Sequence, residues 1–150
     1  MKLGVIGSPI EHSKSPEIHT NFANQFDLDL VFDKYLVNKD ECLEWIKSFF
    51  ESGGLGLSVT LPLKEVVLEI ADDISLRAKQ AAAANMLFLK DGKIFADCTD
   101  GLGLVTDLKT KEIDISDQKI LILGAGGAAK GIVPSLSLIH ISEPTRPLDI

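Results

Sequence analysis

The chain of 150 residues is poor in cysteine, and this scarcity excludes two classes of protein. Cys42 and Cys98 are its only cysteines, too few for a disulfide framework and without neighbours spaced as zinc ligands. Long hydrophobic runs are also absent, since no apolar stretch approaches the ~20 residues of a membrane span. Met1 leads into a short strand-like run rather than an export signal, so the sequence predicts a cytoplasmic protein without a membrane partner.

Basic residues are also scarce: the chain has 15 lysine and arginine residues and 22 aspartate and glutamate residues, which gives a formal net charge of -7. Proteins that bind nucleic acid concentrate Lys and Arg, so this balance argues against a nucleic-acid partner. Metal binding has little support, because His12 and His19 lie seven residues apart without a nearby acidic ligand arrangement. The remaining composition, 45% hydrophobic and 25% charged, is typical of a globular protein.

Strand-like and helix-like segments alternate along the chain. Short apolar runs bounded by turn residues predict strands over Leu3–Ile6, Leu30–Val37 and Leu55–Thr60, and a hairpin of Met86–Leu89 and Lys93–Ala96. Helical spacing and capping residues predict helices that begin at Ser15, as the N-cap, and at Asn38, and helices over Lys64–Ala71, Ser75–Ala84 and Gly101–Lys111. This alternation indicates an α/β fold with a mostly parallel sheet.

A glycine-rich turn follows a further apolar run at Ile120–Leu123, which predicts a buried strand. Gly124 suits a tight turn, Gly126 allows a close backbone approach to a pyrophosphate, and Ala129 stands at the position of the third glycine. A small-residue helix then begins, whose free amides would face an anion. The pattern favours nucleotide binding over an ordinary strand-to-helix turn.

Two α/β domains are therefore expected. Residues 1–100 form a substrate-binding and catalytic domain, and residues 101–134 hold a linking helix, which is the expected hinge, and the start of a Rossmann-type dinucleotide-binding domain. Residues 135–150 are expected to be a non-native tail, because the run from Ser137 to Pro147 resembles a translated sequencing adapter. On this interpretation the reading frame is truncated, and the chain alone has little or no activity.

The tail offers two further interpretations, both weak. Leu136–Ile141 could be taken as a second strand, followed by Glu143 as a ribose-binding acid or Arg146 as a clamp for a 2′-phosphate. Pro144 and Pro147 disfavour both interpretations, as does the short helix that would precede the strand. We assign no cofactor role after Ala129.

Polar residues gather in loops where predicted strands of the first domain have just ended. Ligands of open α/β sheets bind beyond the carboxyl ends of the strands, so these loops are expected to converge on one crevice. The candidate residues are Ser13, Ser15, Thr60, Lys64, Asn85 and Asp100. Five of the six also have a purely structural explanation: Ser15 and Asp100 as helix caps, Thr60 as a strand former, Lys64 as a surface lysine and Asn85 as the end of a helix.

Taken together, the segments resemble the shikimate dehydrogenase family. The resemblance covers Met1 to about Pro134, and its motifs are specific as a set in their order and spacing. The matching segments are Gly7–Pro16 (GSPIEHSKSP), Gly56–Lys64 (GLSVTLPLK), Ala84–Leu87 (ANML), Thr99–Gly101 (TDG) and Gly124–Ala129 (GAGGAA).

The resemblance implies NADPH-dependent reduction of 3-dehydroshikimate to shikimate. It implies that Ser13 and Ser15 hold the substrate carboxylate, that Thr60, Lys64, Asn85 and Asp100 contact ring hydroxyls and the reacting oxygen, and that Lys64 and Asp100 are the catalytic pair. Residues Gly124, Ala125, Gly126, Gly127 and Ala128 would hold the cofactor, with NADP implied by resemblance alone. Hydride reduction of a ketone creates an alkoxide, which a nearby ammonium can stabilise and protonate.

Two positions depart from the family pattern and leave alternatives open. Ser58 and Cys98 each stand where the family commonly has Asn, so each loses an amide and affinity or substrate choice is expected to differ. The alternatives are an inactive fragment or noncatalytic carboxylate-binding module, and a quinate/shikimate dehydrogenase with different cofactor choice. The sequence leaves the oligomeric state open, with a homodimer as one alternative.

Overall fold

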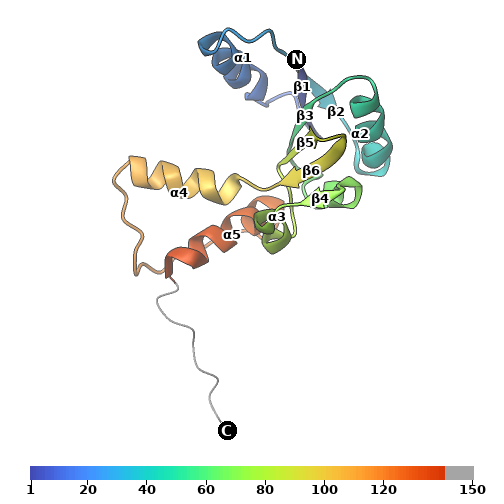
Figure 1. Ribbon diagram of the computed structural model, residues 1–150. Helices are drawn as coiled ribbons and strands as arrows, with labels where there is room; N and C mark the ends of the chain where they lie inside the picture. The colour runs from blue at the N-terminus through green and yellow to red at the C-terminus, as the bar shows by residue number, and fades with distance from the viewer. Residues whose placement is uncertain (141–150) are drawn as a thin grey trace.

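The computed structural model describes residues 1–140 and contains one six-stranded sheet flanked by helices (Figure 1). The strand order is β2-β1-β3-β5-β6-β4. The strands are β1 (Lys2–Gly7), β2 (Val31–Leu36), β3 (Gly56–Val59), β4 (Asp73–Ile74), β5 (Met86–Lys90) and β6 (Lys93–Asp97). The helices are α1 (Ser15–Gln25), α2 (Cys42–Glu51), α3 (Leu76–Ala81), α4 (Asp100–Thr110) and α5 (Gly127–His140), with short 3₁₀ turns η1 (Lys39–Glu41) and η2 (Val66–Ile70).

The predicted α/β class is confirmed, and the sheet is mixed. Strand β1 pairs in parallel with β2 and with β3, as the alternation of strands and helices predicts. The predicted hairpin forms as β5 and β6, and it enters the same sheet antiparallel to β3. Asp91 and Gly92 both have positive φ, at 53° and 77°, which is the geometry of a tight two-residue hairpin turn.

The sheet buries apolar residues on both faces because successive strand residues point to opposite sides. Val5 and Phe32 pack with Ile10 beneath α1, where His19 stacks on Phe32 with ring centroids 4.3 Å apart. Ile6 faces the larger core on the other side. This core holds α2, η2 and α3 through Cys42, Ile46, Phe49, Leu57, Leu63, Val67, Ala78, Ala81 and Leu87.

Three predicted helix boundaries are wrong in detail. Ser15 is the first residue of α1 and Lys14 is its N-cap, so the Ser15 hydroxyl is released from the capping role. The expected helix over Lys64–Ala71 is the shorter 3₁₀ turn η2, followed by the short strand β4. The expected helix over Ser75–Ala84 ends at Ala81, because Ala82 adopts a left-handed conformation with φ 48°.

The prediction of a buried strand at Ile120–Leu123 is wrong for the described chain. These residues form no strand, and Leu121 and Leu123 are 83% and 89% exposed. A strand needs a partner for its backbone groups, and no other segment of residues 1–140 pairs with this one. The glycine turn itself is present, with Gly124 at φ 118°, and the predicted helix follows as α5.

Helix α5 lies against α3 and α4 and brings the glycine turn next to the first domain (Figure 1). It extends through residues 135–140, which were expected to belong to a non-native tail. The expectations for Ile141, Glu143 and Arg146 lie outside the described residues. Within residues 1–140, no helix has the length and apolar character needed to cross a bilayer.

Candidate active site

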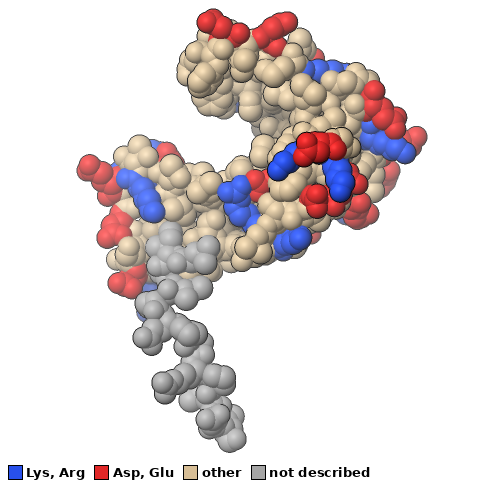
Figure 2. Space-filling view, in the orientation of Figure 1, with Lys and Arg blue, Asp and Glu red and all other residues tan. Residues whose placement is uncertain are grey.

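All six residues predicted to bind substrate line one cavity of about 380 Å³. Space-filling atoms show a hollow between α1 and α4, the two helices whose first residues, Ser15 and Asp100, border this cavity (Figure 2). The full lining is Val5, His12, Ser13, Lys14, Ser15, Ser58, Val59, Thr60, Lys64, Asn85 and Asp100. The six predicted residues, which are spread over almost ninety positions from Ser13 to Asp100, therefore meet at one place, as the loop positions predict.

Serine hydroxyls form one wall of the cavity. The Ser13 hydroxyl donates to the Ser15 hydroxyl at 3.2 Å and accepts from the Ser15 backbone amide at 3.3 Å. Lys14 lies between them and turns outward, where its ammonium is 3.7 Å from Glu17. Both hydroxyls border the cavity: the Ser15 proton is left to donate to a ligand, and the Ser13 proton can do so once it rotates away from Ser15, which suits a carboxylate.

The opposite wall holds a charged pair. The Lys64 ammonium donates to Asp100 Oδ2 at 2.5 Å, and their side chains are only 13% and 22% exposed. Asn85 Nδ2 donates to the other carboxylate oxygen, Oδ1, at 2.9 Å, and Asn85 Oδ1 accepts the Thr99 backbone amide at 2.9 Å. Both oxygens of Asp100 are therefore held in defined directions.

Backbone hydrogen bonds fix the segments that carry this pair. The Ala84 amide donates to the Lys64 carbonyl at 2.7 Å, and the Val59 amide donates to the Asn85 carbonyl at 2.8 Å. Because the loops after β3 and before β5 are joined in this way, Lys64 and Asn85 keep their places relative to each other. These backbone hydrogen bonds tie the two loops to each other and to the end of β3.

A buried cluster that the sequence analysis missed supports the end of β6. Asp97 is 6% exposed, and its carboxylate accepts hydrogen bonds from Ser75, Arg77 and the Cys98 amide. Burial alone would raise the pKa of Asp97, but these hydrogen bonds and the Arg77 charge hold that pKa below its usual value. The available signal was an acidic residue directly after the predicted strand Lys93–Ala96, three positions before Asp100.

The two departures from the family pattern have different surroundings. Ser58 lines the cavity on β3, so the identity of its side chain bears on the site directly. Cys98 does not line it; the thiol is buried and lies 3.9 Å from the Gly131 carbonyl of α5. Burial raises the pKa of Cys98, and it raises that of Cys42 to about 11, so both thiols are protonated at neutral pH.

A second hollow, of about 290 Å³, joins the cavity to the glycine turn. Thr60 and Lys64 line both spaces, and Gly126, Gly127 and Ala128 form the far side of the second one. Gly124 and Ala125 line a neighbouring hollow beside α3. A Cβ on Gly127 would lie 2.9 Å from Lys64 Cβ, so only glycine permits this approach.

These features fit a dinucleotide cofactor at the turn. The first residue of α5 adjoins Lys64, and the backbone is bare of side chains at Gly126 and Gly127, where a phosphate would approach. Lys130 and Glu65 form an ion pair of 2.7 Å beside this hollow and tie α5 to the loop of Lys64. A reacting group placed there would lie next to the cavity that holds the Lys64–Asp100 pair.

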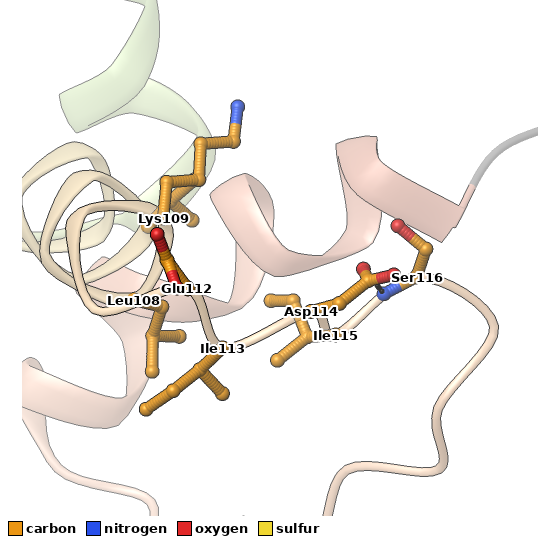
Figure 3. A pocket seen from close by; sticks show the side chains of 8 residues that line it. Leu108, Lys109, Glu112, Ile113, Asp114, Ile115 and Ser116 are labelled. Carbon is orange, nitrogen blue, oxygen red and sulfur yellow. Dashed lines mark hydrogen bonds between the residues drawn. The ribbon is translucent and has the colours of Figure 1, made fainter.

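Another hollow, of about 260 Å³, lies away from these residues at the end of α4. Leu108, Ile113 and Ile115 form its apolar part, with Glu112 and Asp114 beside them (Figure 3). None of the predicted site residues lines it. In the part of the chain that the structure describes, no group of three or more His, Cys, Asp or Glu side chains is placed to hold a metal ion.

Comparison with known proteins gives a consistent result. Residues 5–87 match the shikimate dehydrogenase substrate binding domain. The NADP(+) shikimate dehydrogenase of Hydrogenovibrio crunogenus is 46% identical over 149 residues, which cover 94% of this chain and 54% of the relative. That of Methylococcus capsulatus is 47% identical over 137 residues, covering 90% of this chain and 49% of the relative.

A solved structure extends the likeness to the fold. Shikimate 5-dehydrogenase of Thermus thermophilus, in complex with NADP(H) and shikimate, has a TM-score of 0.86 and 28% identity. The match covers 92% of this chain and 52% of that chain. This chain thus spans about half the length of the relatives that it matches.

Proposed function

Because this chain belongs to the shikimate dehydrogenase family, we propose that it binds shikimate and 3-dehydroshikimate and carries the acid–base pair for their NADP-dependent interconversion. The observation that carries the proposal is the single 380 Å³ cavity lined by all six predicted substrate residues. Two hydroxyl donors stand on one wall and a lysine–aspartate pair on the other. This polarity matches a small ring with a carboxylate at one end and hydroxyls at the other.

The side chains divide the chemistry by position. Ser13 and Ser15 bind the carboxylate and orient the ring, and Thr60 and Asn85 receive hydroxyls along its edge. Lys64 Nζ donates the proton to the oxygen that gains charge when the ketone is reduced. Asp100 Oδ2 keeps Nζ in place, and Asn85 holds Asp100 through Oδ1.

The hollow beside the glycine turn and the names of the relatives support a proposal for the cofactor. A nicotinamide cofactor, when bound, supplies the hydride for the reduction. Gly126, Gly127 and Ala128 would hold it in the hollow next to Lys64, with Gly124 and Ala125 forming the turn behind them. We assign NADP because the curated relatives are named as NADP(+) enzymes. Residues 1–100 act as the substrate domain and residues 101–134 as the linker and the start of the cofactor domain.

Calorimetry with shikimate and the 150-residue chain tests the binding proposal. Binding in the wild type, with at least tenfold weaker binding in Ser13→Ala/Ser15→Ala, is expected. The control is Ser116→Ala, which removes a hydroxyl outside the cavity. Absence of binding by a folded wild-type chain would contradict the proposal.

A second candidate, a noncatalytic carboxylate-binding module, is favoured by one observation: Ile120–Leu123, the strand that should support the cofactor turn, is not formed. NADPH oxidation with 3-dehydroshikimate distinguishes the two candidates. Shikimate binding without turnover supports the module for this chain, and turnover contradicts it. The same assay with NADH and quinate tests the alternative of a quinate/shikimate enzyme with different cofactor choice.

A further inference from the structure

Helix α5 contacts the catalytic pair through two glycines. Gly127 and Gly131 are four residues apart and so lie on one face of the helix. The backbone at Gly127 adjoins Lys64, and the backbone at Gly131 adjoins Asp100 and Cys98. The helix that begins at the cofactor turn therefore touches both members of the pair.

The close packing at Gly131 involves one carboxylate oxygen of Asp100, Oδ2. A Cβ there would lie 3.0 Å from Asp100 Oδ2 and 3.1 Å from Cys98 Sγ. Oδ2 is the oxygen that accepts the hydrogen bond from Lys64, at 2.5 Å. Asn85 holds the other oxygen, so the carboxylate cannot turn away freely to make room. An added methyl group would push Oδ2 by a few tenths of an ångström.

The close packing at Gly127 involves Lys64, the other member of the pair. Its added Cβ would meet Lys64 Cβ at 2.9 Å, and this atom is the base of the side chain rather than its flexible end. The Lys64 backbone is itself fixed by the hydrogen bond from the Ala84 amide. A side chain at position 127 would therefore displace the whole helix or the loop that carries Lys64.

We propose that Gly127 and Gly131 are positioning residues, which let α5 set the distance between Lys64 and Asp100. The inference rests on the proposed function of that pair and extends it. It means that the helix carrying the cofactor turn also fixes the proton-donating group, so that a shift of α5 changes the cofactor hollow and the acid–base pair together. The Lys130–Glu65 ion pair adds a second contact between α5 and the loop that carries Lys64.

The experiment compares Gly131→Ala with Gly103→Ala in the ligand-free 150-residue chain. Gly103 is a suitable control because it also lies in a helix and a Cβ there would meet nothing within 4 Å. NMR follows the side-chain ¹³C resonances of Lys64 Cε and Asp100 Cγ, assigned with Lys64→Ala and Asp100→Asn. We expect both resonances to move in Gly131→Ala at least threefold more than in Gly103→Ala.

A second variant separates a general loss of stability, caused by crowding at position 131, from a change in the positions of Lys64 and Asp100. Cys98→Ala removes the sulfur that crowds position 131, so Gly131→Ala/Cys98→Ala should regain thermal stability while the Lys64 and Asp100 resonances stay displaced. If Gly131→Ala alone does not fold, the Lys64 and Asp100 resonances are compared in the double variant instead. Unmoved resonances in a folded variant, or their full return on Cys98→Ala, would overturn the proposal. No substrate enters this test, so its failure is distinct from a failure to bind shikimate.

Discussion

Arg77 and Asp97 form a two-pronged ion pair at the end of β6, in which Nε donates to Oδ1 at 3.1 Å and Nη2 donates to Oδ2. The Asp97 side chain is buried, whereas that of Arg77 is 47% exposed. Asp97 lies three residues before Asp100, so the pair anchors the strand end that leads into the first residue of α4. Its energetics are open to direct measurement.

The first prediction concerns the pH dependence of stability. The folded-state pKa of Asp97 lies below its ordinary value of 3.8, so the carboxylate stabilises the fold above that pH. This contribution is lost as pH falls from about 4 through the folded-state pKa. Urea unfolding of the wild type between about pH 2.5 and 6 should show a steeper decline than Asp97→Asn. Parallel pH profiles in the two proteins would contradict the assignment.

Removal of Asn85 should weaken both stability and binding. Asn85→Ala deletes hydrogen bonds to Asp100 and Thr99, which leaves partly buried groups unpaired and costs about 1–3 kcal/mol. Shikimate affinity should fall at least tenfold, because Asp100 loses its fixed direction. Calorimetry and urea unfolding measure the two effects. Gln118→Ala, an exposed amide on a loop, is the control and should change neither.

Lys64 should matter for turnover more than for binding. In a version extended to the relatives' full length, Lys64→Ala should lower kcat for the reduction of 3-dehydroshikimate by about 10²–10⁴-fold, since it removes the proposed proton donor. The value of KM for 3-dehydroshikimate should change much less. Lys111→Ala, which removes an exposed lysine paired with Asp107, serves as the control. A kcat equal to that of the control would remove Lys64 from the mechanism.

The buried thiols should resist modification in the folded chain. Burial raises the pKa of Cys42 to about 11, so almost no thiolate forms at about pH 8. Ellman's reagent should therefore react with two thiols per chain in urea and with almost none in buffer. The raised pKa has a second consequence: stability that is present below the ordinary value of 9.0 is lost as pH rises toward 11. Rapid reaction in buffer would show that the core opens readily.

Sequence patterns predicted the local elements and the site more closely than the long-range pairing. Ser13, Thr60 and Asp100 could be placed in one crevice because each lies at or shortly after the end of a predicted strand. The antiparallel entry of β5 into the sheet could not be predicted, since a hairpin's position in a sheet depends on packing with distant strands. Asp97 could be placed in the polar segment after the strand but not given a structural role, because its partner Arg77 belongs to another element, twenty positions earlier.

The segment Ile120–Leu123 shows how an apolar pattern can mislead. A run of apolar residues predicts a buried strand, yet burial needs neighbouring strands, and residues 1–140 supply none there. Leu123→Ala should therefore change the free energy of unfolding by less than about 0.5 kcal/mol, as for an exposed position. Leu57→Ala, at a fully buried leucine of β3, should cost about 2–5 kcal/mol. Urea unfolding of the 150-residue chain compares them directly, and a cost at Leu123 near that at Leu57 would mean that the segment is buried in solution.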